Sequence, residues 1–98
     1  MIKIKKCNFY VLNEGDNVAL ALSAIRAGEV LHIGDRKVKI IENIPFGFKI
    51  SLVNIPSGTE VVKDGFPIGV STEDIPAGAL VHVHNLKSRR SQEWVMKE

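Results

Sequence analysis

A corner signature that occurs four times constrains this chain more than any other feature of its sequence. Each copy has a small or polar residue, then Ile, usually Pro, any residue and Gly, and a β-branched or apolar run follows. Pro suits the second position of a type I turn because its φ is already set, and Gly is favoured at the fourth position, so each copy is predicted to reverse the chain and start a strand. The copies are AIRAGEVL at 24–31, with Arg26 in place of Pro, NIPFGFKI at 43–50, NIPSGTEV at 54–61 and DIPAGALV at 74–81.

The segments between the corners predict the fold class. Successive corner glycines are 19, 11 and 20 residues apart, which is too uneven for a solenoid whose units stack by translation. A two-residue hairpin turn is predicted at Asp64–Gly65, and another hairpin is predicted at GDRK, 34–37. Apolar residues mostly alternate, as strands with one buried face require. These pairs are Ile2 and Ile4, Val38 and Ile40, Ile50 and Leu52, and Val81 and Val83. The sequence therefore predicts a mainly β domain of short strands and corners.

One window, GDNVALALSAI at 15–25, predicts a short helix within this β domain. Asp16 can cap a first helical turn, and Val18, Leu22 and Ile25 fall on one face at spacings of four and three residues. A second prediction concerns the end of the chain. Residues 1–88 are expected to form the domain and residues 89–98 a tail, either frayed or a short helix that docks Trp94 and Met96.

Size and composition limit the classes of function. A chain of 98 residues with 45% hydrophobic and 24% charged residues fits one globular domain. The single cysteine, Cys7, cannot form a disulfide within the chain, and neither a signal peptide nor a membrane-spanning run is recognisable, so a cytoplasmic protein without a membrane partner is expected. A formal charge of +2 with 6% aromatic residues argues against a nucleic-acid partner.

The stretch HVHN, at 82–85, is the best candidate site. If it continues a strand, His82 and His84 share one face, and the two imidazoles can chelate a metal such as Fe²⁺ or Zn²⁺ while Asn85 orients a water or a substrate oxygen. A third ligand would then come from His32, a carboxylate or another chain. The alternative is that both imidazoles decorate an exposed strand face. Lys49 and Lys63 can bind a carboxylate as point charges, although lysine on a solvated strand face is the ordinary outcome.

The order of the motifs identifies a resemblance. The succession GDNVALAL, IRAG, IPFGFKISL and IPSGTEVVKDGFPIGVSTEDIPAGALVHVHN, from about residue 9 to Leu86, resembles the SAF domain of the altronate and galactarate dehydratase family, and the small subunit of sulfolactate sulfo-lyase is similar. The resemblance implies a β-clip fold. The positions that match the family pattern are Asp16, Asn17, Gly47, Lys49, Lys63, Gly65, Gly69, Gly78, His82, His84 and Asn85.

The resemblance also implies a function. In this family a large catalytic domain or subunit removes water from a sugar acid, with a divalent metal, commonly iron, as Lewis acid. This chain is then expected to be an accessory lyase subunit that is not active alone, with a large dehydratase subunit and a sugar acid as partners and a homo-oligomer as a further option. Substrate contacts are expected at His82, His84, Asn85 and Lys49, and metal contacts at His82 and His84.

The chain departs from the family pattern at three positions. Phe48 stands where the family's GHK motif has histidine, Leu80 stands where a further histidine is usual, and Asp64 replaces a tyrosine before the hairpin glycine. Phenylalanine and leucine cannot transfer a proton or bind a metal. A second hypothesis is therefore a stand-alone SAF module that binds a ligand or scaffolds an oligomer without catalysis.

Overall fold

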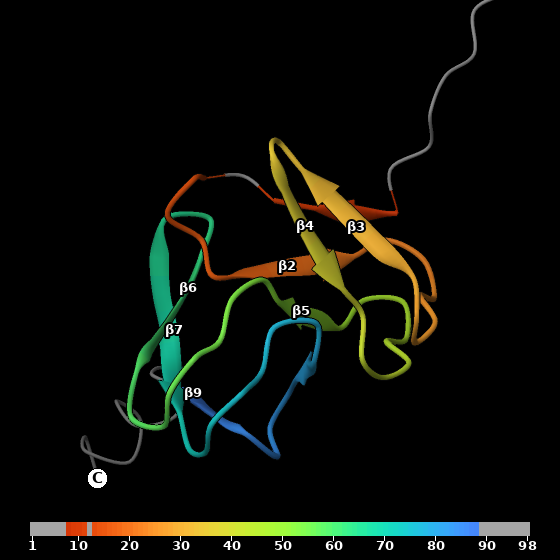
Figure 1. Cartoon of the computed structure of the whole chain (residues 1–98). Coiled ribbons are helices and arrows are strands. Elements are labelled where there is room, and N and C mark those ends of the chain that lie inside the picture. Colours follow the sequence, from red (N-terminus) through yellow and green to blue (C-terminus); the bar gives the residue numbers. More distant parts are fainter. Residues whose placement is uncertain (1–7, 12, 89–98) are drawn as a thin grey trace, which may run out of the picture.

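A computed structural model describes residues 8–11 and 13–88, and every regular element in this part of the chain is a β-strand (Figure 1). The mainly β prediction is thereby confirmed. The strands are β1 (Phe9–Tyr10), β2 (Val18–Ala21), β3 (Val30–Ile33), β4 (Arg36–Lys39), β5 (Lys49–Ser51), β6 (Glu60–Lys63), β7 (Phe66–Ser71), β8 (Leu80–Val81) and β9 (Leu86–Ser88). Among the described residues no helix has the length and apolar character needed to cross a membrane.

The strands form three antiparallel sheets. The central sheet has the order β1-β2-β5-β8, the hairpin β3–β4 stands by itself, and the third sheet has the order β6-β7-β9. Both predicted hairpins are confirmed, because Ile33 pairs with Arg36 and Lys63 pairs with Phe66, each across two residues. In the second hairpin Asp64 and Gly65 both have positive φ, 57° and 82°, which is the pattern of a type I′ turn.

The four corners share one geometry, which differs from the predicted type I turn by one residue. In three of them the N–H of the residue after Gly donates to the carbonyl at the Pro or Arg26 position, at 3.1 to 3.2 Å. Gly is thus the third residue of the turn, and its φ of 82° to 98° at all four corners is typical of a type II turn. Only glycine adopts this φ without strain, so the signature depends on its glycine more than on its proline.

The corners occur in two pairs, and each pair encloses a hairpin. Ile25 bridges Ile44 and Ile55 bridges Ile75, with reciprocal backbone hydrogen bonds of 2.7 to 2.9 Å in both pairs. Corner, hairpin, corner and central strand follow one another twice, first from residue 25 to β5 and then from residue 55 to β8. Equivalent corner glycines are 30 and 31 residues apart. The uneven intervals between successive glycines therefore conceal a twofold structural repeat.

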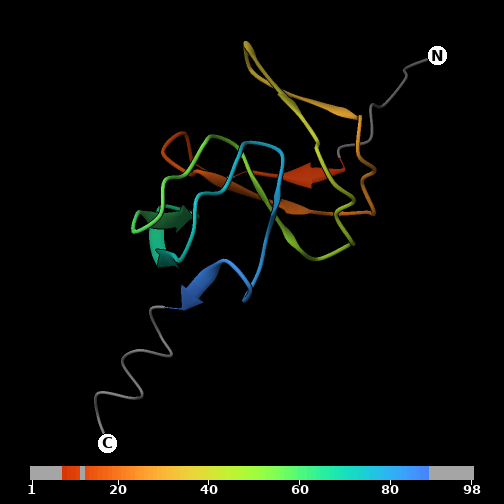
Figure 2. The same ribbon diagram turned by 60° about the horizontal axis from the view of Figure 1, so that its bottom comes forward.

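The central sheet separates two hydrophobic clusters. On one side Ala19 and Ile50 pack with Leu31, Val38 and other residues of the β3–β4 hairpin and its corners. On the other side lie residues that face β6, β7 and β9, namely Val18, Ile55, Val61, Ile75, Ala79 and Val81. The β3–β4 hairpin and β9 consequently lie on opposite sides of the molecule (Figure 2).

The predicted helix over residues 15–25 is wrong, because Val18–Ala21 form β2 in the middle of the central sheet. Val18 and Ala19 are both fully buried, each in a different cluster. A strand covered on both faces has apolar residues at every position. The corner that follows places Ile25 in the core as well, and together these segments imitate a helical spacing.

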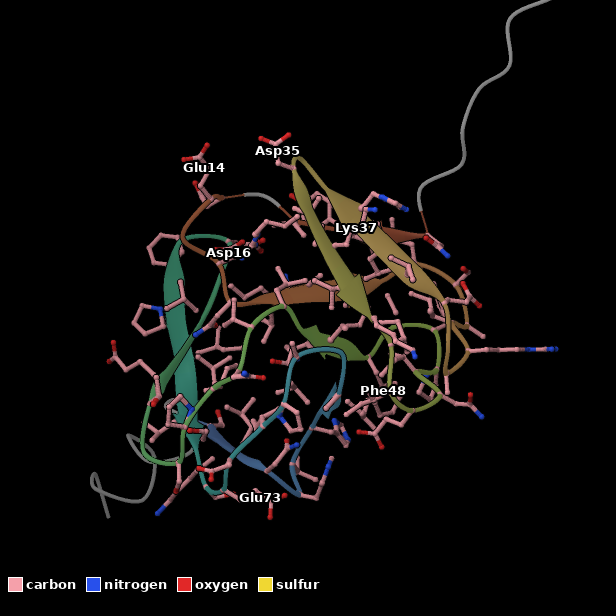
Figure 3. The ribbon with its side chains drawn as sticks, viewed as in Figure 1. Glu14, Asp16, Asp35, Lys37, Phe48 and Glu73 are labelled. Atoms are coloured by element: carbon pink, nitrogen blue, oxygen red, sulfur yellow. The ribbon has the colours of Figure 1, made fainter. Side chains whose placement is uncertain are left out.

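Asp16 has a different role from the predicted helix cap. Its buried carboxylate accepts hydrogen bonds from the N–H groups of Asn13 (3.2 Å), Asp64 (2.9 Å) and Gly65 (2.9 Å). Figure 3 shows it beside the tip of the β6–β7 hairpin. The next residue, Asn17, accepts from Val62 N–H at 2.7 Å and donates to the Glu60 carbonyl at 3.0 Å, where a β-bulge interrupts the ladder. These two side chains fix the second hairpin to the start of β2.

Several predictions fall on residues that the structure does not describe. They concern the alternation of Ile2 and Ile4 and the tail at 89–98 with Trp94 and Met96.

Candidate functional site: a basic groove beside the HVHN turn

A groove of about 630 Å³ opens where the central sheet meets the third sheet. β8 belongs to the first of these sheets and β9 to the second, and the HVHN segment connects them. Its polar lining residues are Lys49, Thr72, His82, Lys87 and Ser88, and its apolar ones are Ile68, Val83 and Leu86. Among the described residues, this lining contains two lysines and a histidine and no acidic side chain.

The HVHN segment is a turn, so the predicted strand alternation of its histidines is wrong. β8 ends at Val81, and residues 82–85 form a bend and turn before β9. Asn85 causes this change of direction. Its backbone N–H donates to the His82 carbonyl at 3.0 Å, its Oδ1 accepts from His82 N–H at 2.9 Å, and its Nδ2 donates to the Leu80 carbonyl at 2.8 Å.

Asn85 therefore holds the turn from inside. Only 4% of its surface is exposed, and both functional atoms of its amide have partners in the chain. A neighbouring backbone bond, from Thr72 N–H to the Asn85 carbonyl at 3.0 Å, ties the turn to the end of β7. The expected contact between Asn85 and a substrate is not tested by this geometry, but its structural role is clear.

The ring of His82 packs against Phe48. The two ring centroids are 4.6 Å apart and the ring planes are inclined by 50°. Phe48, half-buried against the first hydrophobic cluster, precedes β5 and lies beside the segment that carries β8 (Figure 3). Contacts of this geometry are favourable because the edge of one ring meets the face of the other. Phe48, where the resemblance leads us to expect a histidine, thus contacts the first histidine of HVHN.

Lys49 enters the groove from β5. It pairs directly with Val81, and side chains that are opposite each other in an antiparallel pair point to the same face of the sheet. Val81 belongs to the second cluster, so Lys49 lies on the side of the third sheet, where Lys87 of β9 also lines the groove. Neither lysine forms an ion pair with another described residue.

The structure brings together part of the predicted site. Lys49 and His82 line the groove, whereas His84 is exposed in the turn outside the lining and Asn85 is buried beneath it. Lys63 lies elsewhere, in an ion pair with Asp64 at 2.9 Å and 5.9 Å from the ring centre of Tyr10. Sequence reasoning missed Lys87 and Thr72.

The residues of this turn do not make a complete metal site by themselves. Catalytic metal sites generally use about three protein ligands, and no group of three or more His, Cys, Asp or Glu side chains occurs among residues 8–11 and 13–88. His82 is in the groove lining and His84 is not, and His32 is on the exposed side of β3. The described residues therefore offer no third ligand for the predicted pair.

A second, smaller groove of about 370 Å³ lies over the bridge between the third and fourth corners. It is lined by Asn54, Ile55, Pro56, Asp74, Ile75 and Pro76. One oxygen of each polar side chain already accepts a backbone hydrogen bond, Asp74 Oδ1 from Ser57 N–H at 2.8 Å and Asn54 Oδ1 from Ala77 N–H at 2.9 Å. This groove is a product of corner pairing, and the one charged side chain of its lining, Asp74, is acidic, so it does not suit an anionic ligand.

Comparison with known proteins gives a consistent family. Residues 7–89 match the family model described as the altronate/galactarate dehydratase SAF domain. Altronate dehydratase of Bacillus subtilis is 40% identical over 84 residues, which are 86% of this chain and 17% of that protein. Galactarate dehydratase (L-threo-forming) of Escherichia coli is 33% identical over 76 residues, which are 74% of this chain and 14% of that protein. This chain thus spans only a small part of each dehydratase.

A third relative has nearly the same extent as this chain. The (2R)-sulfolactate sulfo-lyase subunit alpha of Chromohalobacter salexigens is 26% identical over 89 residues, which are 83% of this chain and 95% of that subunit.

Proposed function

The chain belongs to the altronate/galactarate dehydratase SAF-domain family, and from that premise we propose that it is the small subunit of a sugar-acid dehydratase or related lyase. In this proposal it assembles with a separate large catalytic subunit. The observation that carries the proposal is the alignment with the sulfolactate sulfo-lyase subunit alpha, because 95% of a named subunit corresponds to this one domain. The dehydratases, of which the chain spans 17% or less, support a larger catalytic part.

The groove is the part of this subunit that contacts the acid. Lys49 and His82 would bind the carboxylate of the sugar acid, and exposed His84 would approach it from the rim once the large subunit is in place. A lysine attracts the anion as a point charge, and an imidazole can donate a hydrogen bond to it. The fourth residue predicted to contact the substrate, Asn85, would act indirectly, because its amide shapes the turn that presents His82.

In this proposal a metal belongs to the assembled enzyme, and no chemical step takes place on a metal held by this chain alone. A divalent metal supplies Lewis acidity for loss of a hydroxyl group from a sugar acid. His82 and His84 would provide at most two of its ligands, so the others would come from the large subunit.

The test is co-purification from the native cell at low salt. The tagged chain should recover a larger protein in stoichiometric amount, and the eluate should dehydrate an aldonic or aldaric acid such as altronate or galactarate. The chain alone should show no such activity. A tagged Asn85→Ala variant, which lacks the amide that holds the HVHN turn, would show whether recovery of the larger protein depends on this turn. Recovery of the chain without a partner, or of a partner whose activity does not depend on it, contradicts the proposal.

The second candidate is a stand-alone SAF module, and Phe48 is the observation that favours it. A phenyl ring stands where the resemblance leads us to expect a histidine and contacts His82, so an ionisable group next to His82 would be lost. This hypothesis requires that His82→Ala and His84→Ala leave assembly unchanged and that purified chain contains no metal. Stoichiometric iron or zinc, measured by elemental analysis, would count against it.

A further inference from the structure

We infer that the basic groove is a preorganised site for small acids that carry two anionic groups, and that the chain binds such acids without a metal or a partner. The inference deepens the proposed function, since it names the class of acid that the small subunit selects. It rests on four observations: the origin of the basic side chains, the lack of acids around them, the fixed turn and the apolar floor.

The basic side chains of the groove come from different parts of the fold. Lys49 is on β5 of the central sheet, Lys87 is on β9 of the third sheet, and His82 lies in the turn between the sheets. Two lysines fixed on separate sheets provide two attachment points for one ligand. An acid with two anionic groups can pair a separate group with each lysine, whereas the single carboxylate of a mono-acid would have to be shared between them.

The positive charge of the groove is not compensated within the described residues. No acidic side chain lines it, and the ion pair that the described residues form, between Lys63 and Asp64, lies outside it. Like charges that converge on one cavity repel one another, and an anionic ligand relieves that repulsion. The uncompensated positive charge therefore favours a negatively charged ligand.

The groove is also shaped before any ligand arrives. The buried amide of Asn85 fixes the backbone of His82, and the ring of Phe48 restricts its imidazole. A side chain that is already held loses little conformational entropy when it binds. Phe48 therefore acts as a positioning residue for His82.

The volume of the groove and its apolar floor are both suited to a small acid. The groove of about 630 Å³ is within the usual range of small-molecule sites, and Ile68 and Leu86 form part of an apolar lining. His82 and Lys87 are exposed, so an ion pair in the groove is screened by water and each charge contact adds only modestly to the affinity. The apolar side chains offer a surface for the carbon chain of the acid.

The experiment is a titration of the full ¹⁵N-labelled chain at low salt, followed by NMR. The probes are galactarate with two carboxylates, galactonate with one, and the neutral polyol galactitol. The expected result is saturable shifts at the amides of residues 48–50 and 81–88, with galactarate binding about threefold to fivefold tighter than galactonate, as one added exposed ion pair would give. Galactitol should cause no shifts.

Matched variants separate the site from general attraction. Lys49→Gln and Lys87→Gln should each weaken galactarate binding about threefold to fivefold. Lys39→Gln, an exposed lysine of β4 outside the groove, should leave it unchanged. Absence of saturable shifts, an equal effect of Lys39→Gln, or equal affinity for inorganic sulfate would overturn the inference.

Failure here differs from failure of the proposed function. If the chain recovers its large subunit and supports dehydration but does not bind galactarate alone, the subunit role stands and the site does not. If galactarate binds but no large subunit is recovered, the site stands and the subunit role does not.

Discussion

A missing hydrogen bond at one corner gives the sharpest test of the twofold repeat. In the second pair of corners the residue before each Ile accepts a backbone hydrogen bond from the opposite corner: Asp74 from Ser57 N–H at 2.8 Å and Asn54 from Ala77 N–H at 2.9 Å. In the first pair Asn43 accepts from Ala27 N–H at 3.0 Å, but the equivalent of Asn54 is Ala24, which has no acceptor. Ala24→Asn should restore the fourth bond, to Phe46 N–H.

The structure sets the size of the effect. The bridge of the first pair, between Ile25 and Ile44, has the same reciprocal hydrogen bonds as that of the second pair, so the backbones are placed alike. Ala24 is exposed, so the larger side chain meets no core residue. One added hydrogen bond should raise the free energy of unfolding by about 1 kcal/mol. For a domain of this length that corresponds to a rise in Tm of about 4–8 °C.

The assay is urea and thermal unfolding followed by circular dichroism. Ala24→Lys, which adds polarity but no acceptor, is the matched control and should change stability little. Asn54→Ala and Asp74→Ala should each lose about 1 kcal/mol with an unchanged urea m value. If these two variants lose stability while Ala24→Asn and Ala24→Lys are equally stable, the two pairs of corners are not equivalent and the reasoning fails.

Three further predictions concern single positions and are measured by the same unfolding assay. Gly78→Ala should destabilise severely, because a Cβ there would overlap the Lys39 carbonyl, whereas Gly28→Ala, with the same positive φ but open space, should cost only about 1 kcal/mol; equal losses would contradict this. Asp16→Ala should cost about 2–4 kcal/mol because it removes a buried acceptor of three backbone N–H groups, and exposed Glu14→Ala is its control; a loss as small as the control's would disprove the anchoring role. Asn85→Ala should cost about 2 kcal/mol and shift the NMR signals of the His82 ring, whereas His84→Ala should do neither; an unperturbed His82 in Asn85→Ala would show that the turn holds without its amide.

Local backbone chemistry made much of the fold predictable from the sequence. The Asp64–Gly65 turn follows from the tolerance of these two residues for positive φ, and the corners follow from Gly after Ile-Pro. The intervals between successive glycines do not show the repeat, because each repeat contains two corners and the two intervals within it differ in length. Intervals between alternate glycines, 30 and 31 residues, carry the signal.

The predictions that are wrong concern segments in which long-range contacts override the local sequence pattern. Val18–Ala21 has a helix-like neighbourhood, but pairing with β5 on one side and β1 on the other makes it a strand. Val81 and Val83 alternate with histidines as in a strand, yet the amide of Asn85 closes a turn and leaves Val83 80% exposed. The groove itself is lined by residues from β5, β7 and β9, and no local sequence pattern predicts that Lys49 and Lys87 share it.

The contact between Phe48 and His82 shows where in the structure the departure of Phe48 from the expected family pattern lies. The half-buried ring of Phe48 packs against the first hydrophobic cluster, and its centroid is 4.6 Å from that of His82, a residue of the groove lining. A histidine at position 48 would stand beside His82 and offer a second imidazole for proton transfer or metal binding. Phenylalanine preserves the packing that orients His82 and removes that chemistry. The groove of this chain is therefore suited to hold and orient an anion, and in the proposed assembly the proton transfer and the loss of hydroxyl belong to the large subunit.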